Sequence, residues 1–325
     1  MSNPSFWKNR KVFVTGGTGL LGSEMVTTLL DFGANVVTLV RDRTCRSRFF
    51  LEDLDKKVDI VYGDITDFSL VERSIGEHDV NTIFHLAAQT IVGIANASPI
   101  STFKSNIEGT WNVLEAARQH SGHIRSVVVA SSDKAYGPSD ILPYDESTCL
   151  RGRHPYDVSK SCTDLIAQSY YHTYDLPVSI TRCGNLFGPG DLNFNRLIPG
   201  TIKSILNGTA PILRSDGTFI RNFFYTKDAV DGYLTLSENL DKGRGEAFNF
   251  GTEERYSVLE ATNIVLERMN STLQPDIQDE VKNEIKDQYL GVSKAKNVLG
   301  WTPKYTMVQA LDETIAWYKE YFGQE

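Results

Sequence analysis

Two side chains with complementary chemistry, Tyr156 and Lys160, stand four residues apart in the segment YDVSK. The pattern over residues 156 to 171 predicts a helix, and side chains at positions i and i+4 project from the same helical face. An ammonium group next to a phenol favours the phenolate and lowers the phenol's pKa from its usual value of ~10. The spacing therefore predicts that Tyr156 acts as a base with Lys160 beside it.

Three further polar residues end the apolar segment SVVVASSDK, namely Ser132, Asp133 and Lys134. The apolar run predicts a buried strand over residues 126 to 132, so Ser132 lies at its carboxyl end and can hydrogen-bond the same substrate oxygen as Tyr156. Two adjacent charges directly after a buried strand need a partner or a function. Asp133 and Lys134 either neutralise each other or contact a ligand, with or without proton transfer.

A glycine-rich turn lies near the N-terminus, in the segment TGGTGLLGS. It joins a predicted strand at 11–15 to a predicted helix at 20–32. In such a turn, backbone N–H groups approach a pyrophosphate closely, and the positive end of the following helix favours its charge. The motif predicts a dinucleotide phosphate site formed by Gly16, Thr18, Gly19, Leu20, Leu21 and Gly22.

The other contacts of a dinucleotide can be placed on the strands that follow. An acidic residue for the ribose 2′-hydroxyl is expected about 20 residues after the glycines, where the sequence reads LVRDR. Asp42 could accept from a free 2′-hydroxyl, whereas Arg41 and Arg43 could pair with a 2′-phosphate, so NAD and NADP both stay open. Lys160 could hold the nicotinamide ribose. The further residues expected at the cofactor are Asp64 and Ile65, at the adenine, and Leu86, Ala87, Ala88, Gln89 and Asn106.

Short β-branched runs alternate with helical patterns, for example over 102–118, in the first half of the chain. The predicted strands lie at 11–15, 35–40, 59–64, 82–88, 126–132 and 177–182. Such alternation is typical of βαβ units, so we expect an α/β fold with a doubly wound parallel Rossmann sheet. We place a dinucleotide-binding domain at 1–184 and a second, smaller α/β substrate domain at 185–325. The segment near 221–252 could return to the first domain.

The composition excludes some classes of partner. The formal net charge is −8 and no basic cluster dominates, so we do not expect a nucleic acid as partner. No stretch reaches the ~20 apolar residues that span a bilayer, and the N-terminus lacks a secretory signal. The four cysteines and the histidines show no metal-ligand spacing, so we expect no metal, reduced thiols and a cytoplasmic protein. His85, in an apolar strand, is expected to be a core residue.

Several segments, taken in order, resemble the extended short-chain dehydrogenase/reductase family, and specifically its nucleotide-sugar epimerases and dehydratases. They are TGGTGLLGS, GDITD, HLAAQ, SNIEGT, SSDKAYG, YDVSK and RCGNLFGPGD, followed by YLGVSKAKNVLGWTP near the C-terminus. The likeness covers nearly the whole chain. It implies a tightly held nicotinamide cofactor, a nucleoside-diphosphate sugar across the domain interface and a homodimer formed through two long helices.

The resemblance also implies how a reaction would proceed. Tyr156 would remove the proton of the sugar 4-hydroxyl while a hydride passes from C4 to the nicotinamide. A 4-epimerase then returns the hydride to C4 without further acid or base. A 4,6-dehydratase removes the C5 proton and expels water from C6, which calls for a second acid and base. Ser132-Asp133-Lys134 resembles the form in CDP-glucose 4,6-dehydratases, with Asp133 as the acid at the C6 hydroxyl and Lys134 as the base at C5.

Three further residues are expected to hold the diphosphate or the sugar, namely Asn185, Arg196 and Arg221, because the guanidinium fork suits phosphate. The expected function is therefore a nucleotide-sugar 4,6-dehydratase, with CDP-glucose as a candidate substrate. The alternatives are a 4-epimerase on the same scaffold and a non-catalytic dinucleotide-binding protein. The nucleotide stays open, because the segment RSDGTFIRNFFYTKD resembles the general form of the family rather than that of the CDP-glucose enzymes.

Overall fold

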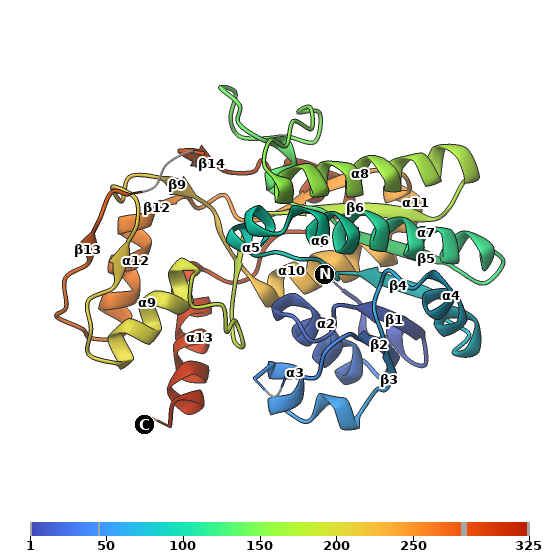
Figure 1. Ribbon diagram of the computed structural model, residues 1–325, viewed down its shortest axis with the longest axis horizontal. Helices are drawn as coiled ribbons and strands as arrows, with labels where there is room; N and C mark the ends of the chain where they lie inside the picture. Colours follow the sequence, from blue (N-terminus) through green and yellow to red (C-terminus); the bar gives the residue numbers. More distant parts are fainter. Residues whose placement is uncertain (1, 45, 281–284, 324–325) are drawn as a thin grey trace.

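The computed structural model describes residues 2–44, 46–280 and 285–323. Its larger part, on the right in Figure 1, is built on a seven-stranded sheet with the order β11-β6-β5-β4-β1-β2-β3. All six pairings in this sheet are parallel. The strands are β1 (Lys11–Thr15), β2 (Asn35–Val40), β3 (Asp59–Tyr62), β4 (Thr82–His85), β5 (Ser126–Ala130), β6 (Val178–Cys183) and β11 (Ala247–Phe250). The predicted fold class is confirmed.

Helices cover both faces of this sheet, because successive strand residues point to opposite sides. In β1, Val12 and Val14 pack into the core on one face and Phe13 into the core on the other. The first face is covered by α2 (Leu20–Asp31) and α10 (Thr226–Glu238), and the second by α4 (Phe68–Glu77), α7 (Gly109–Gln119) and α8 (Pro155–Tyr174). Burial on both faces explains why the central strands β1, β4 and β5 carry continuous apolar runs in the sequence, whereas the edge strand β3 is partly exposed.

The structure differs from the predicted boundaries in two ways. β3, β4 and β5 end two or three residues before the predicted strand ends, so the polar residues after them lie in loops at the carboxyl edge. The predicted helix at 102–118 is also interrupted, since α6 (Pro99–Phe103) and α7 are joined by a π-helical turn, η2 (Lys104–Glu108). Such turns are rare and often occur at functional sites.

The C-terminal part of the chain, on the left in Figure 1, packs three helices around a separate apolar core. They are α9 (Leu197–Leu206), α12 (Val258–Arg268) and α13 (Met307–Tyr321). Its short strands are β7 (Asn185–Phe187), β8 (Ile212–Leu213), β9 (Ile220–Arg221), β10 (Phe223–Tyr225), β12 (Tyr256–Ser257), β13 (Asp276–Ile277) and β14 (Asp287–Gln288). α10 and β11, although they come late in the chain, belong to the large sheet. The division at residue 184 stays a prediction.

The remaining elements are short. They are α1 (Pro4–Trp7), α3 (Arg48–Leu51), η1 (Leu54–Lys56), α5 (Val92–Ala97), η3 (Asp133–Tyr136), α11 (Leu240–Gly243) and η4 (Ala295–Leu299). Within the described ranges, no helix has both the length and the apolar character to cross a membrane. Cys149, Cys162 and Cys183 are free thiols, and Cys45 lies outside the described residues.

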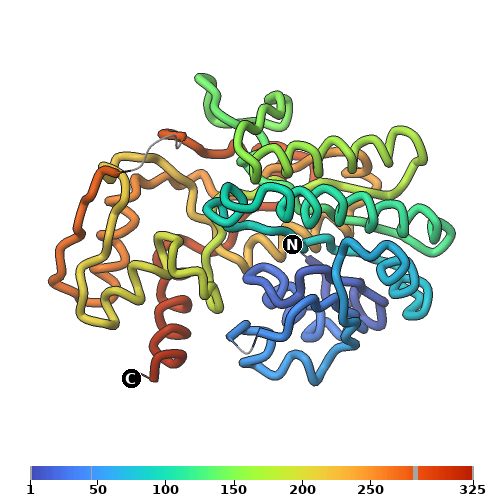
Figure 2. Tube along the Cα trace, viewed as in Figure 1, coloured from blue at the N-terminus to red at the C-terminus, as the bar shows by residue number. Residues whose placement is uncertain are grey.

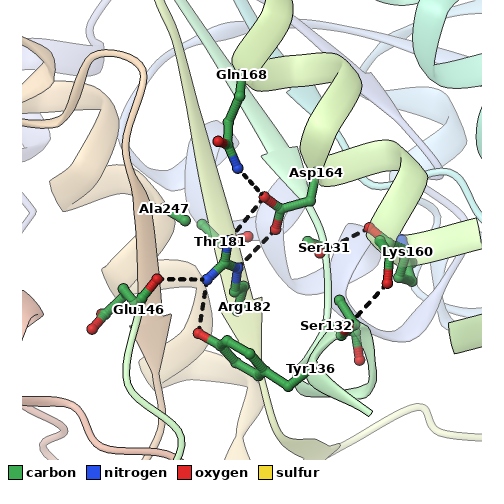
Figure 3. A network of polar contacts seen from close by, with 12 residues as sticks. Ser131, Ser132, Tyr136, Glu146, Lys160, Asp164, Gln168, Thr181, Arg182 and Ala247 are labelled. Carbon is green, nitrogen blue, oxygen red and sulfur yellow. Dashed lines mark hydrogen bonds and ion pairs between the residues drawn. The ribbon is translucent and has the colours of Figure 1, made fainter. Parts of the chain in front are cut away.

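A buried ion pair ties β6 to α8 directly behind the carboxyl edge of the sheet. The guanidinium of Arg182 donates to both carboxylate oxygens of Asp164, over 2.7 and 2.9 Å. Their side chains are 4% and 0% exposed. Figure 3 shows that the same guanidinium reaches the hydroxyl of Tyr136, at 2.9 Å, and the backbone carbonyl of Glu146. Tyr136 is the last residue of η3, so this pair supports the turn that carries Asp133 and Lys134.

Removal of one partner of this ion pair should destabilise the fold strongly. Asp164→Ala would leave the Arg182 guanidinium buried without its counter-ion, and we expect a loss of about 3–5 kcal/mol in the free energy of unfolding. Asp312→Ala removes an exposed pair with Arg268, where the carboxylate is 46% exposed, and should cost at most about 1 kcal/mol. Urea unfolding measures both, and equal losses would contradict this account.

Candidate active site

A cavity of about 1370 Å³ opens at the carboxyl edge of the large sheet and is lined by both parts of the chain. Its walls include the loops that follow β1, β2, β4 and β5, and, from the C-terminal part, residues 193–201 and 212–215. Ligand sites of open α/β sheets form at this edge. The cavity is larger than the ~300–1,000 Å³ of a usual small-molecule site, so it has room for two ligands.

The glycine-rich turn forms one end of this cavity, and all six residues predicted at the phosphate site line it. Gly16 has a φ of +74°, and a Cβ there would lie 2.7 Å from the backbone nitrogen of Ala87. A Cβ at Gly22 would lie 2.0 Å from the carbonyl oxygen of Gly16. No side chain caps α2 at Gly19, which leaves the first helical N–H groups to an anion. The turn therefore fits a pyrophosphate.

The residues predicted near the adenosine also border the cavity. Arg41 and Asp42 form an ion pair at 2.6 Å with each other, and both side chains are more than half exposed. Arg43 lies 3.5 Å from Asp55 instead. Asp64 and Ile65 line the cavity as well. The structure thus places one acid and one arginine of the segment LVRDR, Asp42 and Arg41, at the cavity wall, and their positions do not decide between NAD and NADP.

The loop after β4 is held from behind by Asn106. Leu86, Ala87 and Ala88 line the cavity, whereas Gln89 and Asn106 do not border it. The amide of Asn106 accepts from the backbone nitrogen of Gln89 at 2.7 Å and donates to its carbonyl oxygen at 3.1 Å. The buried Asn106 side chain, in the π-helical turn, therefore positions the loop. A contact with the cofactor stays a prediction for Gln89 and Asn106.

Tyr156 and Lys160 lie in the first turns of α8, and both line the cavity. The pKa of Tyr156 is raised to about 12, because burial outweighs a hydrogen bond from Ser132 and the charge of Arg196. Burial also lowers the pKa of Lys160 to about 8, and its amine donates to the carbonyl oxygen of Ala130 at 2.7 Å. The prediction that Lys160 lowers the pKa of Tyr156 was wrong for the chain by itself, since burial disfavours both charges.

The carboxyl group of Asp133 is buried at the floor of the same cavity and is 4% exposed. Burial raises its pKa, against the lowering effects of Lys134, Ser132 and Arg221. The Ser132 hydroxyl donates to Asp133 Oδ1 at 3.0 Å and accepts from the backbone nitrogen of Lys134 at 3.2 Å. A carboxyl group with a raised pKa holds its proton closer to neutral pH, which suits an acid.

The side chain of Lys134 lines the cavity next to Asp133. Its Nζ donates to Oε1 of Gln288 at 2.7 Å, so its partner in that bond is a neutral amide from β14. Sequence reasoning missed Gln288. It lies in a strand of two residues, far along the chain from Lys134, and no local pattern signals the contact.

The three predicted substrate residues line the cavity on the side of the C-terminal part. Arg196 bonds Asp191 at 3.0 Å and reaches the hydroxyl of Thr90 across the cleft at 3.4 Å. The guanidinium of Arg221 donates to backbone carbonyls at 285 and 286, and the Asn185 amide bonds the carbonyl of Asn222. Arg214, which sequence reasoning also missed, borders the cavity beside them.

His85 is not a catalytic group in this arrangement. Its Nδ1 lies 2.8 Å from the hydroxyl of Thr15 and its Nε2 lies 3.0 Å from the hydroxyl of Thr110, so both ring nitrogens have partners. Full burial lowers its pKa to about 3. His85 therefore stays neutral and links β1, β4 and α7, as a core residue does.

Comparisons with known proteins identify the family of this chain. The family model described as GDP-mannose 4,6 dehydratase matches residues 13–314. The CDP-glucose 4,6-dehydratase of Salmonella typhimurium is 30% identical, over all of this chain and 95% of that protein.

Two solved structures are similar over nearly the whole chain. A dTDP-glucose 4,6-dehydratase from Streptomyces venezuelae with NAD bound is 29% identical, has a TM-score of 0.86 and covers 96% of this chain and 98% of its own. A UDP-glucose 4-epimerase from Thermotoga maritima with UDP-glucose is 26% identical, has a TM-score of 0.89 and covers 96% and 99%. The chain therefore belongs to the extended short-chain dehydrogenase/reductase family of nucleotide-sugar dehydratases and epimerases.

Proposed function

We propose that this protein is a nucleotide-sugar 4,6-dehydratase that converts an NDP-hexose to an NDP-4-keto-6-deoxyhexose. The observation that carries the proposal is that Asp133 and Lys134 border the same cavity as Tyr156. A 4-epimerase needs the tyrosine alone, because the hydride leaves and returns at one carbon. An additional acid and base in reach of the sugar serve an elimination.

The first step belongs to Tyr156, which takes the proton of the sugar 4-hydroxyl while Ser132 donates a hydrogen bond to the same oxygen. Burial raises the pKa of Tyr156, so the phenolate depends on nearby cations. Arg196, whose charge lowers the pKa of Tyr156, is one cation that the chain supplies, and Lys160, one helical turn away, would hold the nicotinamide ribose. When bound, the nicotinamide would accept the hydride from C4 and return it to C6.

The second step belongs to Asp133 and Lys134. The C5 hydrogen is acidified by the new C4 carbonyl, and the Lys134 amine removes it as a proton. The bond between C6 and its hydroxyl breaks, and Asp133 gives its proton to the departing oxygen, so that water leaves. Lys134 then returns a proton to C5, and a proton passes through solvent from Tyr156 to Asp133, which restores both groups for the next turnover.

Two finer assignments accompany this proposal. We assign NAD as the cofactor, because the solved dTDP-glucose 4,6-dehydratase relative holds NAD and Asp42 offers an acceptor for a free 2′-hydroxyl. CDP-glucose is the candidate substrate, because Asp-Lys follows Ser132 as in the CDP-glucose enzymes that the sequence resembles. The substrate panel below tests both the base and the hexose.

Incubation in deuterated water should separate dehydration from epimerisation. With CDP-, UDP-, GDP- and dTDP-hexoses, we expect one of the sugars to give a 4-keto-6-deoxy product with solvent deuterium at C5, because the proton that Lys134 removes exchanges with solvent. Mass spectrometry and NMR measure the product and the label.

An unlabelled 4-epimer in place of this product would contradict the dehydratase and establish the alternative. Tyr156→Phe is the control, since it should bind the cofactor but not reduce it. Unchanged turnover in that variant would show that Tyr156 is not the base.

The pH dependence of the elimination tests Asp133. Because an acid works only when protonated, and burial raises the pKa of Asp133, the rate of water loss should fall as the pH rises through that raised pKa. Asp133→Asn should slow water loss by about 10²–10⁴-fold and remove that alkaline decline. Rapid-quench measurements across pH check this. The same alkaline decline in Asp133→Asn would assign the acid to another group.

We further propose a homodimer formed through α6, α7 and α8, which pack beside one another on the large sheet. Large apolar side chains are exposed there on neighbouring helices, namely Ile100 on α6, Trp111 on α7 and Leu165 on α8. Such exposure on adjacent elements is typical of an interface. The family resemblance implies a dimer formed through two long helices of the first domain, and α7 and α8 are long helices of that part of the chain.

Light scattering should give twice the chain mass of 36.4 kDa for the wild type. Leu165→Asp, which places a charge at the centre of the proposed interface, should give one chain mass. Leu51→Asp is the matched control, because Leu51 is also exposed but lies on α3, and it should stay a dimer. A monomeric wild type, or a Leu165→Asp variant that stays dimeric, would contradict the proposed interface.

A further inference from the structure

The amine of Lys134 is held by a side chain that does not itself border the cavity. Gln288 is 1% exposed, and its Oε1 accepts from Lys134 Nζ at 2.7 Å. Because Gln288 is absent from the cavity wall, any effect it has on a bound sugar passes through Lys134.

The backbone at Gln288 is anchored on both sides. β14 pairs with β9, which sets Gln288 opposite Arg221, and the guanidinium of Arg221 donates to the carbonyls at 285–286. On the other side Leu290 forms a bridge to Tyr144. Figure 2 shows this late segment beside the loop that follows η3. With its backbone fixed in this way, the Gln288 amide has little freedom to move away from the amine.

The chemistry of the partner matters as much as its position. Two carboxyl groups near Lys134 are Asp133, on its own turn, and Asp157, on α8. The charge of Lys134 lowers the pKa of each, although burial has the larger, raising effect. The amine nevertheless donates to a neutral amide oxygen. An amide oxygen accepts a hydrogen bond from the charged or the neutral amine, so the bond persists when Lys134 loses a proton. The lone pair of the neutral amine stays free to accept the proton from C5.

A second observation indicates that the amide is not present for packing. Among the residues that the structure describes, Nε2 of Gln288 is buried and has no hydrogen-bond partner. An unpaired buried N–H group costs free energy, and methionine would fill the same space without that cost. The fold therefore tolerates an unfavourable group at this position, as functional sites often do.

We propose that Gln288 is a positioning residue whose Oε1 holds the Lys134 amine with its lone pair directed at C5 of the sugar. This inference rests on the proposed dehydratase function. Gln288 has no part in oxidation at C4, which depends on Tyr156. Loss of Gln288 should therefore impair one partial reaction and spare the other.

The test separates the two partial reactions with the sugar nucleotide that the wild type converts. Gln288→Met should reduce the bound cofactor at the wild-type rate with unchanged KM, but should exchange the C5 hydrogen with deuterated water about 10²-fold more slowly, since a misplacement of ~1 Å has effects of that size. Gln288→Glu should be slower still, because a carboxylate would hold the amine in its charged form. Gln274→Met, at an exposed glutamine, is the control.

Lys134→Met supplies the reference. The double variant Lys134→Met with Gln288→Met should be no slower in C5 exchange than Lys134→Met alone, because two residues that act as one unit are not additive. Further slowing in the double variant would overturn the proposal. So would wild-type C5 exchange in Gln288→Met, or a parallel loss of cofactor reduction and exchange, which would indicate a merely structural role.

The contact itself can be judged even if no sugar nucleotide yields a 4-keto-6-deoxy product, in which case the proposed function has failed. Gln288→Met should change the urea midpoint of unfolding by different amounts in the wild-type and Lys134→Met backgrounds. Equal changes in the two backgrounds would show that Gln288 and Lys134 are not coupled, and would overturn the positioning role independently of activity.

Discussion

Ionisable groups lie buried at the carboxyl edge of the parallel sheet, and their burial determines the direction in which their pKa values shift. Burial raises the pKa of the Asp133 carboxyl and of the Tyr156 phenol, and lowers that of the Lys160 amine to about 8. Each shift favours the uncharged form. The Asp133 carboxyl, which keeps its proton closer to neutral pH, can therefore give a proton to a sugar, whereas the buried Tyr156 phenol needs a nearby cation to act as a base.

The burial of charged groups also accounts for the contacts that hold η3 in place. The Arg182–Asp164 pair satisfies two charges behind η3 and supports Tyr136, while the segment after residue 284 crosses from the C-terminal part to bond Lys134. The turn η3 is therefore fixed from behind by the large sheet and from the side by the smaller part. Both parts of the chain have to fold before Asp133 and Lys134 are in place.

Features with a local signature could be predicted from the sequence, because strand periodicity, the glycine turn and the Tyr156–Lys160 spacing are each contained in a short segment. The direction of the pKa shift of Tyr156 could not be predicted, because residue spacing reveals neither burial nor the hydrogen bond from Lys160 to the carbonyl of Ala130. The contact between Lys134 and Gln288 depends on the pairing of β9 with β14, two strands of two residues each. Asn106 was placed near the cofactor, but its position behind the loop depends on an unexpected π-helical turn.

The central claim is that Asp133 and Lys134 meet the reacting carbons of a hexose, and a crystal structure with a bound nucleotide sugar tests it most directly. The account predicts Lys134 Nζ within about 3.5 Å of C5 and a carboxyl oxygen of Asp133 within hydrogen-bond distance of the C6 hydroxyl. A hexose bound with its C4 at Tyr156, but with both side chains turned away from C5 and C6, would contradict it.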